Sequence, residues 1–531
     1  MRNKLVLTLI TGILLAAAWP TYGIPVFIFF AFTPLLLVEH DIRMDDQGRK
    51  GLRVFGYAYL AFLIWNSITT WWIWYSTPFG MLFALLVNSL LMAIVFSLYH
   101  FTAKRFPPKI HLVFLPAIWM AFEKFHLNWD FSWPWLNLGN VFSEYTSWIQ
   151  WYEYTGTFGG ALWIWILNIS VYLTILKFYA TGDKKTLSKG IAKNVLFIAI
   201  PVIISMIILM RYQESAEKIE VVLYQPNVDP YTEKYDSSYT NTMIVKQMEE
   251  DTRGDIDRNT QYLIAPETAL ANNTSLESFD FSREKQELQL FAATNPNLKI
   301  ITGADFFKLY GKSQKPPTLS ANRSSRGDWF DVYNAAIQID RKGQTQVYFK
   351  SKLVVGVETF PFKSILQPLL GNIMIDLGGT VLSRGTQEER SVFHSQDGSY
   401  NAAPIICYES VYGEYVSDYV KNGANFLAII TNDAWWDHTQ GHQQHLSYAR
   451  LRAIENRRSV ARSANTGISA LIDEKGTILK TLAYGVKGTV KGDITINNKK
   501  TFYTRYGDYI ARIATLIAGF IFLFAIARKK G

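Results

Sequence analysis

The stretch APIICYES, residues 403–410, holds the only cysteine in a chain of 531 residues. A single thiol cannot form an intramolecular disulfide, and one cysteine cannot build a thiolate cage for a metal. Taken alone, Cys407 is interpreted as a small buried hydrophobic residue, since free cysteine is among the most buried residue types. The rest of the chain favours a chemical role instead.

Residues 212–507, which surround this stretch, alternate between strand-like and helix-like segments. Short apolar runs predict strands at Ile219–Gln225, Tyr262–Ala265, Lys299–Gly303, Tyr333–Asp340, Pro404–Cys407, Phe426–Thr431 and Ile468–Asp473. Longer periodic runs predict helices at Ser237–Thr252, Ser282–Ala293 and Gly441–Arg457. This alternation favours a layered α/β fold, in which active residues gather at the carboxyl ends of strands.

Three reactive side chains occupy that position. Glu267 comes just after one predicted strand, Lys350 ends a second, and Cys407 ends a third. Any one of them alone is weak support, because acidic and basic residues after strands are usually solvated. Lys352 competes with Lys350, since side chains two apart on a strand share a face.

The remainder of the chain predicts membrane spans. Hydrophobic residues make up 49% of the sequence, with 16 Trp, 29 Tyr and 34 Phe, yet the mean hydropathy is only +0.05. A membrane part joined to a soluble part explains this mixture. Apolar stretches lie near 5–19, 24–38, 54–74, 80–101, 111–122, 161–176, 195–210 and 513–527. Because a span needs about 20 mostly apolar residues, we expect eight spans, some tilted or extended into their flanks.

The basic residues predict the orientation of these spans. The net charge is +9, but many Lys and Arg flank apolar segments, which argues for topology rather than nucleic-acid binding. The loops 75–79 and 125–160 contain neither Lys nor Arg. Since positive loops stay in the cytoplasm, both termini are expected there, and residues 212–507 outside. A catalytic domain in that place has no ATP or cytosolic cofactor.

We therefore expect three regions: a transmembrane domain at 1–211, an extracytoplasmic catalytic domain at 212–507, and a final helix with a basic tail at 508–531. The outer loop 125–160 is rich in Trp and Tyr. Two interpretations stay open for it: an aromatic belt at the membrane interface, or a platform that receives a lipid. The spans show no obvious paired charges.

Several motifs in the soluble part resemble the nitrilase, or carbon–nitrogen hydrolase, superfamily. They are YFK at 348–350 followed by LV at 353–354 and Glu358, TNDAW at 431–435, RAIENRR at 452–458 and RSANTG at 462–467. The resemblance implies an αββα sandwich and a Glu–Lys–Cys triad, here Glu267, Lys350 and Cys407. The spacing to Glu358 favours Lys350 over Lys352.

Together with the spans, the whole chain resembles the apolipoprotein N-acyltransferase family of the bacterial inner membrane. The motifs PWL at 134–136 and QWYEYTG at 150–156, and Asn168, add to the likeness. It implies a phospholipid acyl donor and, as acceptor, the N-terminal amine of the diacylglyceryl-cysteine of an apolipoprotein. It implies no cofactor and no metal. Ping-pong transfer through a thioester on Cys407 is then expected.

The same resemblance implies roles for the site residues. Glu267 is expected as general base and Lys350 as the oxyanion-stabilising cation, with the backbone N–H of Tyr408 as a second donor. Glu358 and Glu409 are expected to orient the triad or the amine. The chain departs from the family at 355–357, where VGV replaces the usual Pro-Phe-Gly. Tyr235 is our choice for an aromatic residue that the family carries after its Gln-x-Asn.

Other interpretations remain open. A membrane-tethered amidase or nitrilase would use water as acceptor, but it gives no reason for eight spans. A transporter or receptor with a degenerate nitrilase-like domain, or a lipid-binding scaffold, would not need an intact triad. His438, His442 and His445 suggest a metal site by spacing, yet we expect none there. Nothing in the sequence demands more than a monomer.

Overall fold

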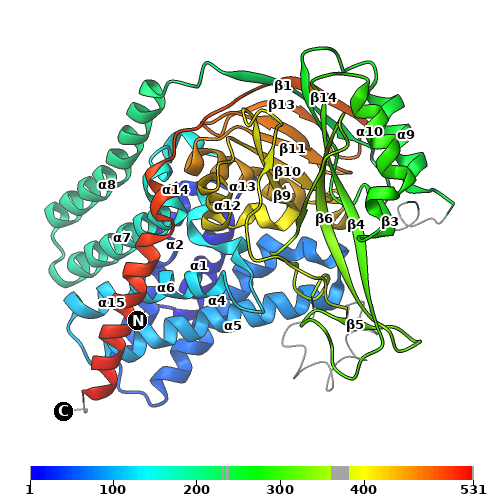
Figure 1. The fold of residues 1–531 in the computed structure, drawn as a ribbon. Helices are drawn as coiled ribbons and strands as arrows, with labels where there is room; N and C mark the ends of the chain where they lie inside the picture. Colours follow the sequence, from blue (N-terminus) through cyan, green and yellow to red (C-terminus); the bar gives the residue numbers. More distant parts are fainter. Residues whose placement is uncertain (1, 230–232, 234–237, 360–381, 529–531) are drawn as a thin grey trace. The chain divides into compact units, whose positions relative to one another are not determined.

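The computed structural model describes residues 2–229, 233, 238–359 and 382–528 (Figure 1). The chain divides into two compact units. One comprises Met1–Trp74, Pro78–Tyr212 and Tyr506–Gly531, and the other comprises Tyr75–Thr77 and Gln213–Arg505. Each unit is described by itself.

The first unit is helical, and all eight predicted apolar stretches form helices. Its helices are α1 Lys4–Ala18, α2 Ile28–Ala31, α3 Thr33–Met44, α4 Lys50–Thr70, α5 Pro78–Ala103, α6 Pro108–His126, α7 Tyr152–Thr181, α8 Lys184–Arg211 and α15 Tyr509–Ala527. Short 3-10 turns lie at Pro25–Phe27, Trp71–Tyr75, Pro134–Leu136, Leu138–Phe142 and Thr146–Trp148. The last three belong to the aromatic loop 125–160.

Five stretches of the described chain are long and apolar enough to cross a membrane, fewer than the eight expected. They are Pro25–Met44, Pro78–Ala103, Tyr152–Thr181, Lys184–Arg211 and Tyr509–Ala527. The three other helices fall short for visible reasons: α1 has only 15 residues, α6 carries three charged residues, and α4 carries polar residues such as Asn66 and Thr69 besides Lys50 and Arg53. The helical bundle is thus as expected, with five long apolar helical stretches among the described residues.

Asn168 of α7 joins the broken helix α2–α3 to the bundle. Its Oδ1 accepts a hydrogen bond of 2.8 Å from the backbone N–H of Phe32, and its Nδ2 donates to the carbonyl of Ile28 at 2.9 Å. Backbone polar groups exposed by a helix break need partners inside a bilayer. The Asn side chain supplies them at this break.

The expectation that the spans hold no paired charges was wrong. Glu39 of α3 is fully buried, accepts from Arg43 at 3.0 Å and lies 2.7 Å from Nδ1 of His100. Arg43 lies four residues after Glu39 on the same helix, beyond the predicted apolar stretch 24–38, and His100 comes from α5, so a scan of the apolar stretches missed both contacts. Such a buried group is tolerated because it is paired.

The second unit contains two β-sheets. The larger has the strand order β14-β1-β2-β4-β6-β5, with β3 beside β4 and β7 beside β6. Its strands are β1 Lys218–Gln225, β2 Thr260–Ile264, β3 Leu270–Ser275, β4 Lys299–Gly311, β5 Asn322–Arg323, β6 Trp329–Asp340, β7 Thr345–Phe349 and β14 Gly488–Thr495. The smaller sheet, in the order β13 to β8, comprises β8 Phe393–His394, β9 Asn401–Ile406, β10 Phe426–Thr431, β11 Val460–Ala464, β12 Ser469–Ile472 and β13 Ile478–Leu482.

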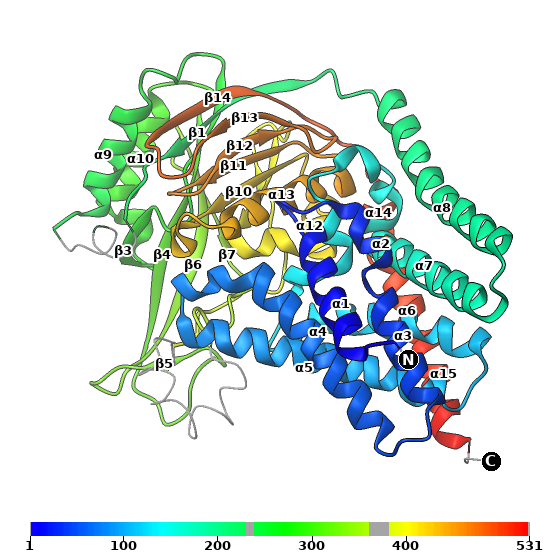
Figure 2. The same ribbon diagram turned by 180° about the vertical axis from the view of Figure 1, so that it is seen from behind.

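Helices cover the outer face of each sheet, which gives the predicted αββα sandwich (Figures 1 and 2). The helices α9 Asn241–Thr252 and α10 Arg283–Ala293 bury Val245, Met248 and Leu288 against the larger sheet. On the other side lie α12 Gly413–Lys421 and α13 Gln440–Asn456, and the short α14 Phe502–Tyr506 follows β14. Between the sheets, the rings of Tyr262 and Phe426 meet edge to face at 5.1 Å.

The strand directions bring the predicted site residues to one edge. β1, β2 and β4 are parallel, as are β9, β10 and β11. β7 pairs antiparallel with β6, which is itself antiparallel to β4, so β7 runs in the direction of β2. The ends of β2 and β7, which carry Glu267 and Lys350, therefore face the same way.

Candidate functional site

Glu267 lies in a backbone turn just after β2 that includes a left-handed residue. The next residue, Thr268, has a left-handed φ of 48°, and Gly303 of β4 packs directly against this turn. A Cβ added at Gly303 would lie 2.2 Å from the backbone N of Thr268 and 2.7 Å from Cα of Glu267. Only glycine leaves room for the Glu267 turn at this point.

Lys350 bridges two carboxylates. Its Nζ lies 2.9 Å from Oε1 of Glu267 and 2.9 Å from Oε2 of Glu358. The Nδ2 of Asn334 donates to both carboxylates, at 2.7 Å and 3.1 Å. The backbone N–H of Asn432, after β10, donates to the other Glu267 oxygen at 3.1 Å. These contacts leave the Glu267 carboxylate fixed in one orientation.

Burial and neighbouring charges shift the pKa values of Lys350 and Glu358 in opposite directions. Burial alone would lower the pKa of Lys350, but the charges of Glu267 and Glu358 hold that pKa well above its usual value. Burial alone would raise the pKa of Glu358, but Lys350 and Arg384 bring that pKa below its usual range. Lys350 is thus a permanent cation in the site.

Cys407 sits in a tight turn between β9 and a 3-10 segment, Cys407–Val411. Its φ is 50°, a left-handed conformation that costs a non-glycine residue free energy, and its side chain is buried. Burial raises the pKa of the Cys407 thiol, the charge of Glu267 raises that pKa further, and Lys350 partly offsets both. The resting residue is therefore a neutral thiol that needs a base to become a nucleophile.

The Glu409 side chain holds this turn in place from inside. Its Oε2 accepts from the backbone N–H of Ile406 at 2.9 Å, and its Oε1 accepts from the N–H of Ser351 at 2.7 Å. The hydroxyls of Tyr348 and Tyr415 donate to the same Oε1, at 2.7 Å and 2.6 Å. Glu409 has no exposed surface, so it connects the two strand ends rather than facing a substrate.

A second buried network lies behind the cysteine. Nε2 of His445 lies 3.1 Å from the carbonyl oxygen of Cys407, and its Nδ1 lies 3.0 Å from Oδ1 of Asp433. Arg462 donates to the other Asp433 oxygen at 2.6 Å. Burial alone would raise the pKa of Asp433, but Arg462 and His445 hold that pKa well below its usual range. The network braces the carbonyl of the strained residue.

These residues also raise the question of a metal site. Ligand atoms of Cys407, Asp433 and His445 all lie within 4.8 Å of one another. The three do not fit a metal as they stand, because both His445 nitrogens already have partners and Arg462 neutralises Asp433. The other two histidines of the predicted cluster pack on Tyr484. The ring centroids of His438 and His442 lie 4.5 Å and 4.3 Å from that of Tyr484.

The remaining predicted residues are placed as follows. Tyr408 is buried and packs edge to face on Tyr412 at 5.3 Å. Lys352, the competitor of Lys350, instead points its Nζ over the ring of Tyr412, 4.9 Å from the centroid. Tyr235 lies outside the described residues.

Sequence reasoning overlooked Asn334, Gly303, Asp433 and the role of His445. A signal for Asn334 existed, since it is a polar residue inside the otherwise apolar start of the strand Tyr333–Asp340. Asp433 stood within the quoted motif TNDAW and His445 within the histidine cluster, but their pairing joins residues that are twelve positions apart.

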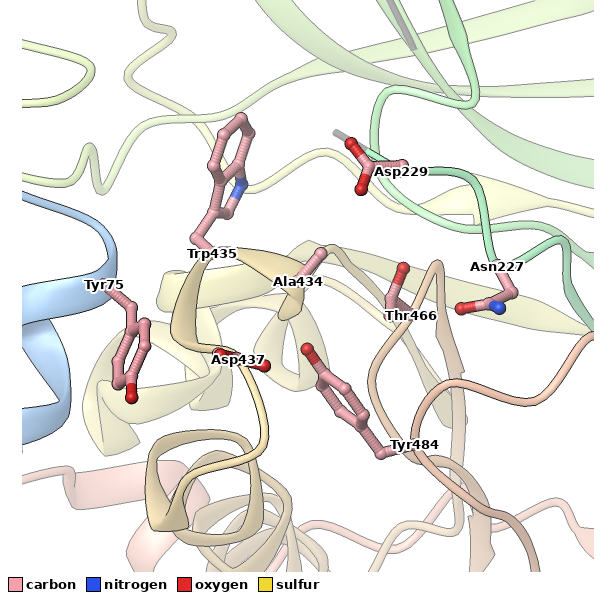
Figure 3. Close-up of a pocket in the computed structure, with 8 residues that line it drawn as sticks. All are labelled: Tyr75, Asn227, Asp229, Ala434, Trp435, Asp437, Thr466 and Tyr484. Carbon is pink, nitrogen blue, oxygen red and sulfur yellow. The ribbon is translucent and has the colours of Figure 1, made fainter. Parts of the chain in front are cut away.

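Two cavities adjoin this site. One of about 520 Å³ is bordered by Glu267, Thr268, Asn227, Tyr239 and Lys487, among others. Figure 3 shows the second, of about 350 Å³, lined by Tyr75, Asn227, Asp229, Ala434, Trp435, Asp437, Thr466 and Tyr484. Asn227 borders both cavities, and Trp435 and Tyr484 line the second.

Two family models match the chain. The model described as "Apolipoprotein N-acyltransferase N-terminal domain" matches residues 11–170, and the model described as "Carbon-nitrogen hydrolase" matches residues 316–501. A protein named apolipoprotein N-acyltransferase from Chlorobaculum tepidum is 28% identical over 539 residues, covering 99% of this chain and 97% of its own. One of the same name from Geobacter metallireducens is 25% identical, covering 100% and 96%.

Solved structures were also compared. An amidase of the nitrilase superfamily from Nesterenkonia aligns with a TM-score of 0.37 and 15% identity, over 57% of this chain and 98% of its own. A nitrilase-superfamily member from Saccharomyces cerevisiae aligns with a TM-score of 0.36 and 16% identity, over 54% and 92%.

Proposed function

This chain belongs to the apolipoprotein N-acyltransferase family, and on that premise we propose that it acylates lipoproteins in the final step of their maturation. A fatty acyl chain moves from a phospholipid to the N-terminal amine of the diacylglyceryl-cysteine of an apolipoprotein. The observation that carries this proposal is the contact between Glu267 and Lys350 beside the buried Cys407, in a chain that matches acyltransferases along its whole length.

In the first half-reaction, Sγ of Cys407 attacks the ester carbonyl of the phospholipid. Glu267 takes the thiol proton and then gives it to the departing lysophospholipid oxygen, so the C–O bond breaks and a thioester forms. A positioned base of this kind contributes about 10²–10⁴ in rate. The neutral resting thiol supports this role, because attack then needs a proton acceptor.

Lys350 stabilises the negative oxygen of the tetrahedral intermediate, with the backbone N–H of Tyr408 as a second donor. Removing one such donor typically costs about 10²–10³ in rate. Its fixed charge and its place between Glu267 and Glu358 support the assignment. Glu358 positions Lys350, and Glu409 positions the turn of Cys407.

In the second half-reaction, the lipoprotein amine attacks the thioester. Glu267 removes a proton from the attacking nitrogen and returns it to the sulfur as the C–S bond breaks. The thioester lets the lysophospholipid leave before the bulky acceptor enters, which makes the kinetics ping-pong. The cavity of about 520 Å³ beside Glu267 gives the acceptor room to approach.

We place the protein in a bacterial inner membrane as a monomer, because one chain supplies Glu267, Lys350 and Cys407. We assign 1–211 and 508–531 to the membrane and 212–507 to a periplasmic catalytic domain, with both termini in the cytoplasm. The absence of Lys and Arg from the loops 75–79 and 125–160 supports this orientation. A reporter fused after residue 211 should read as periplasmic, and a cytoplasmic signal would refute the orientation.

Intact-mass measurement after incubation with phospholipid alone tests the chemistry. We expect an acyl adduct on Cys407 that hydroxylamine removes and that Cys407→Ala lacks. Adding a diacylglyceryl peptide should then move the acyl group to the peptide amine. A hydrolase of the amidase type would instead release free fatty acid at the same rate with or without the peptide, and that result would refute the transfer.

A further inference from the structure

The carbonyl oxygen of Cys407 is contacted by two buried side chains. The hydroxyl of Ser410 donates to it at 2.7 Å, and Nε2 of His445 lies 3.1 Å from it. Ser410 belongs to the 3-10 segment Cys407–Val411, whereas His445 comes from α13. A carbonyl oxygen has two lone pairs, so these two contacts use the whole accepting capacity of this group.

The His445 ring is held so that Nε2 is the donor in this contact. The carbonyl oxygen of Cys407 can only accept, so the hydrogen between the two atoms belongs to Nε2. Oγ of Ser410, whose own hydrogen points to the same carbonyl, lies 3.0 Å from Nε2. On the other side of the ring, Nδ1 lies 3.0 Å from Oδ1 of Asp433 and 3.2 Å from a guanidinium nitrogen of Arg462. These contacts fix the ring with Nε2 towards Cys407.

Local folding accounts for only one of the two bonds. A serine hydroxyl that bonds the carbonyl three residues earlier is common in turns. The contact from His445, however, spans 38 residues, and the ion pair of Asp433 with Arg462 beside that ring has no exposed surface. A buried ion pair gives little net stability compared with apolar residues of similar volume. Stability of the fold is therefore not a sufficient reason for this arrangement.

The same peptide group carries the proposed oxyanion donor. The carbonyl of Cys407 and the N–H of Tyr408 are the two ends of one conjugated amide. Hydrogen bonds to the oxygen of an amide draw electron density from its nitrogen and make the N–H a stronger donor, by about 10–30% for each bond. In a buried site, where the local dielectric is low, this polarisation has its full effect.

We propose that Ser410 and His445 polarise the Cys407–Tyr408 peptide and so strengthen the N–H of Tyr408 towards the tetrahedral oxyanion. Both are positioning residues, because they act through the peptide group and do not touch the substrate. The proposal rests on the proposed function, since it assumes that the N–H of Tyr408 faces the oxyanion. It adds that the strength of this donor is set by side chains from two separate elements.

The test compares two reactions of Cys407 in the full-length protein in detergent. With p-nitrophenyl butyrate, Sγ attacks the ester carbonyl, the thiol proton passes to Glu267, and p-nitrophenolate departs as the thioester forms. This route passes through an oxyanion. Iodoacetamide instead loses iodide from a saturated carbon as the C–S bond forms, and no oxyanion arises. A variant that only displaces the thiol should slow both reactions, whereas a weaker oxyanion donor should slow butyrylation alone.

Ser410→Ala should slow butyrylation about three- to tenfold and leave alkylation unchanged, because the oxyanion donor is weakened and not lost, and complete loss of a donor costs about 10²–10³. His445→Ala should act in the same direction. His445→Gln keeps an N–H donor near the position of Nε2 and should recover part of the loss. Intact mass follows both reactions in every variant.

The matched control is Ser417→Ala on α12. Ser417 is also buried, and its hydroxyl donates to the carbonyl of Gly413, a peptide group outside the site. Butyrylation of Ser410→Ala at the wild-type rate, an equal fall in both of its reactions, or the same selective loss in Ser417→Ala would overturn the proposal.

Two further outcomes separate this proposal from the proposed function. If p-nitrophenyl butyrate does not acylate wild type, no oxyanion site exists and both are overturned. If it acylates wild type but phospholipid does not, the proposed function is refuted, while the two rates of Ser410→Ala still confirm or overturn the polarisation of the peptide.

Discussion

The Nζ atom of Lys350 lies 2.9 Å from Oε1 of Glu267, and both side chains are buried. In the resting site the cation is thus engaged by the proposed general base. In the proposed mechanism, Glu267 becomes protonated during attack, its hold on Lys350 weakens, and the ammonium is released towards the developing oxyanion. The two proposed roles are therefore linked through one contact.

Replacing Lys350 by Met should reduce formation of the Cys407 acyl adduct by about 10²–10³, because an oxyanion donor is lost. Lys352→Met is the matched control, since Lys352 lies over the ring of Tyr412 and not on Glu267. The rate of adduct formation, followed by intact mass, measures both. Equal losses in the two variants would contradict the assignment of Lys350.

The pH dependence of Cys407 alkylation should show the raised thiol pKa. Burial and Glu267 raise this pKa, so the half-maximal rate should lie above about 8.5, the ordinary value. Glu267→Gln removes a negative charge and should move the midpoint down, whereas Lys350→Met should move it up. The alkylation rate with iodoacetamide between neutral and high pH measures all three proteins. A wild-type midpoint at or below the ordinary value would argue against a neutral resting thiol.

Asp433 should stabilise the folded protein in a pH-dependent way. Its folded-state pKa is depressed by Arg462 and His445, so its contribution is fully present above the unfolded pKa of about 3.9. That contribution is lost as pH falls from there towards the folded pKa. The melting temperature of wild type should therefore exceed that of Asp433→Asn at pH 7, and the gap should narrow below about pH 4. A constant gap across this range would rule out the ion pair as its cause.

Gly303→Ala should disturb the turn that carries Glu267. The added Cβ would lie 2.2 Å from the Thr268 nitrogen, an overlap that costs about 1–3 kcal/mol where the backbone has to shift. Gly254→Ala is the control, because nothing lies within 4 Å of its added Cβ. We expect a lower melting temperature and slower adduct formation for Gly303→Ala alone. If both alanine variants behave like wild type, the close approach is unimportant.

The predicted strands correspond closely to the structure where a continuous apolar run in the sequence marks the strand. Phe426–Thr431 has the same bounds in both, because six consecutive residues are fully buried and read as one apolar run. β4 continues to Gly311, eight residues beyond the predicted end at Gly303, because its outer half stays paired with β6 as far as Trp329. Cross-strand pairing, rather than composition, keeps that half in the sheet.

From the sequence, the site could be predicted only for residues whose position relative to a strand could be recognised. Glu267 and Lys350 follow predicted strands, so both the strand pattern and the family resemblance pointed to them. Two other contacts join segments that are distant in the sequence. Asn334 donates to the carboxylate of Glu267, and His445 contacts the carbonyl of Cys407. Such contacts leave no local trace, because an Asn in a strand or a His in a helix has many ordinary explanations.

The Glu409 side chain joins the segment after β7 to the end of β9, through the N–H groups of Ser351 and Ile406. These segments belong to different sheets, and each carries one of the proposed reacting groups, Lys350 or Cys407. One carboxylate thus ties the two strand ends together directly across the sandwich. A substitution of Glu409 would therefore loosen both ends at once.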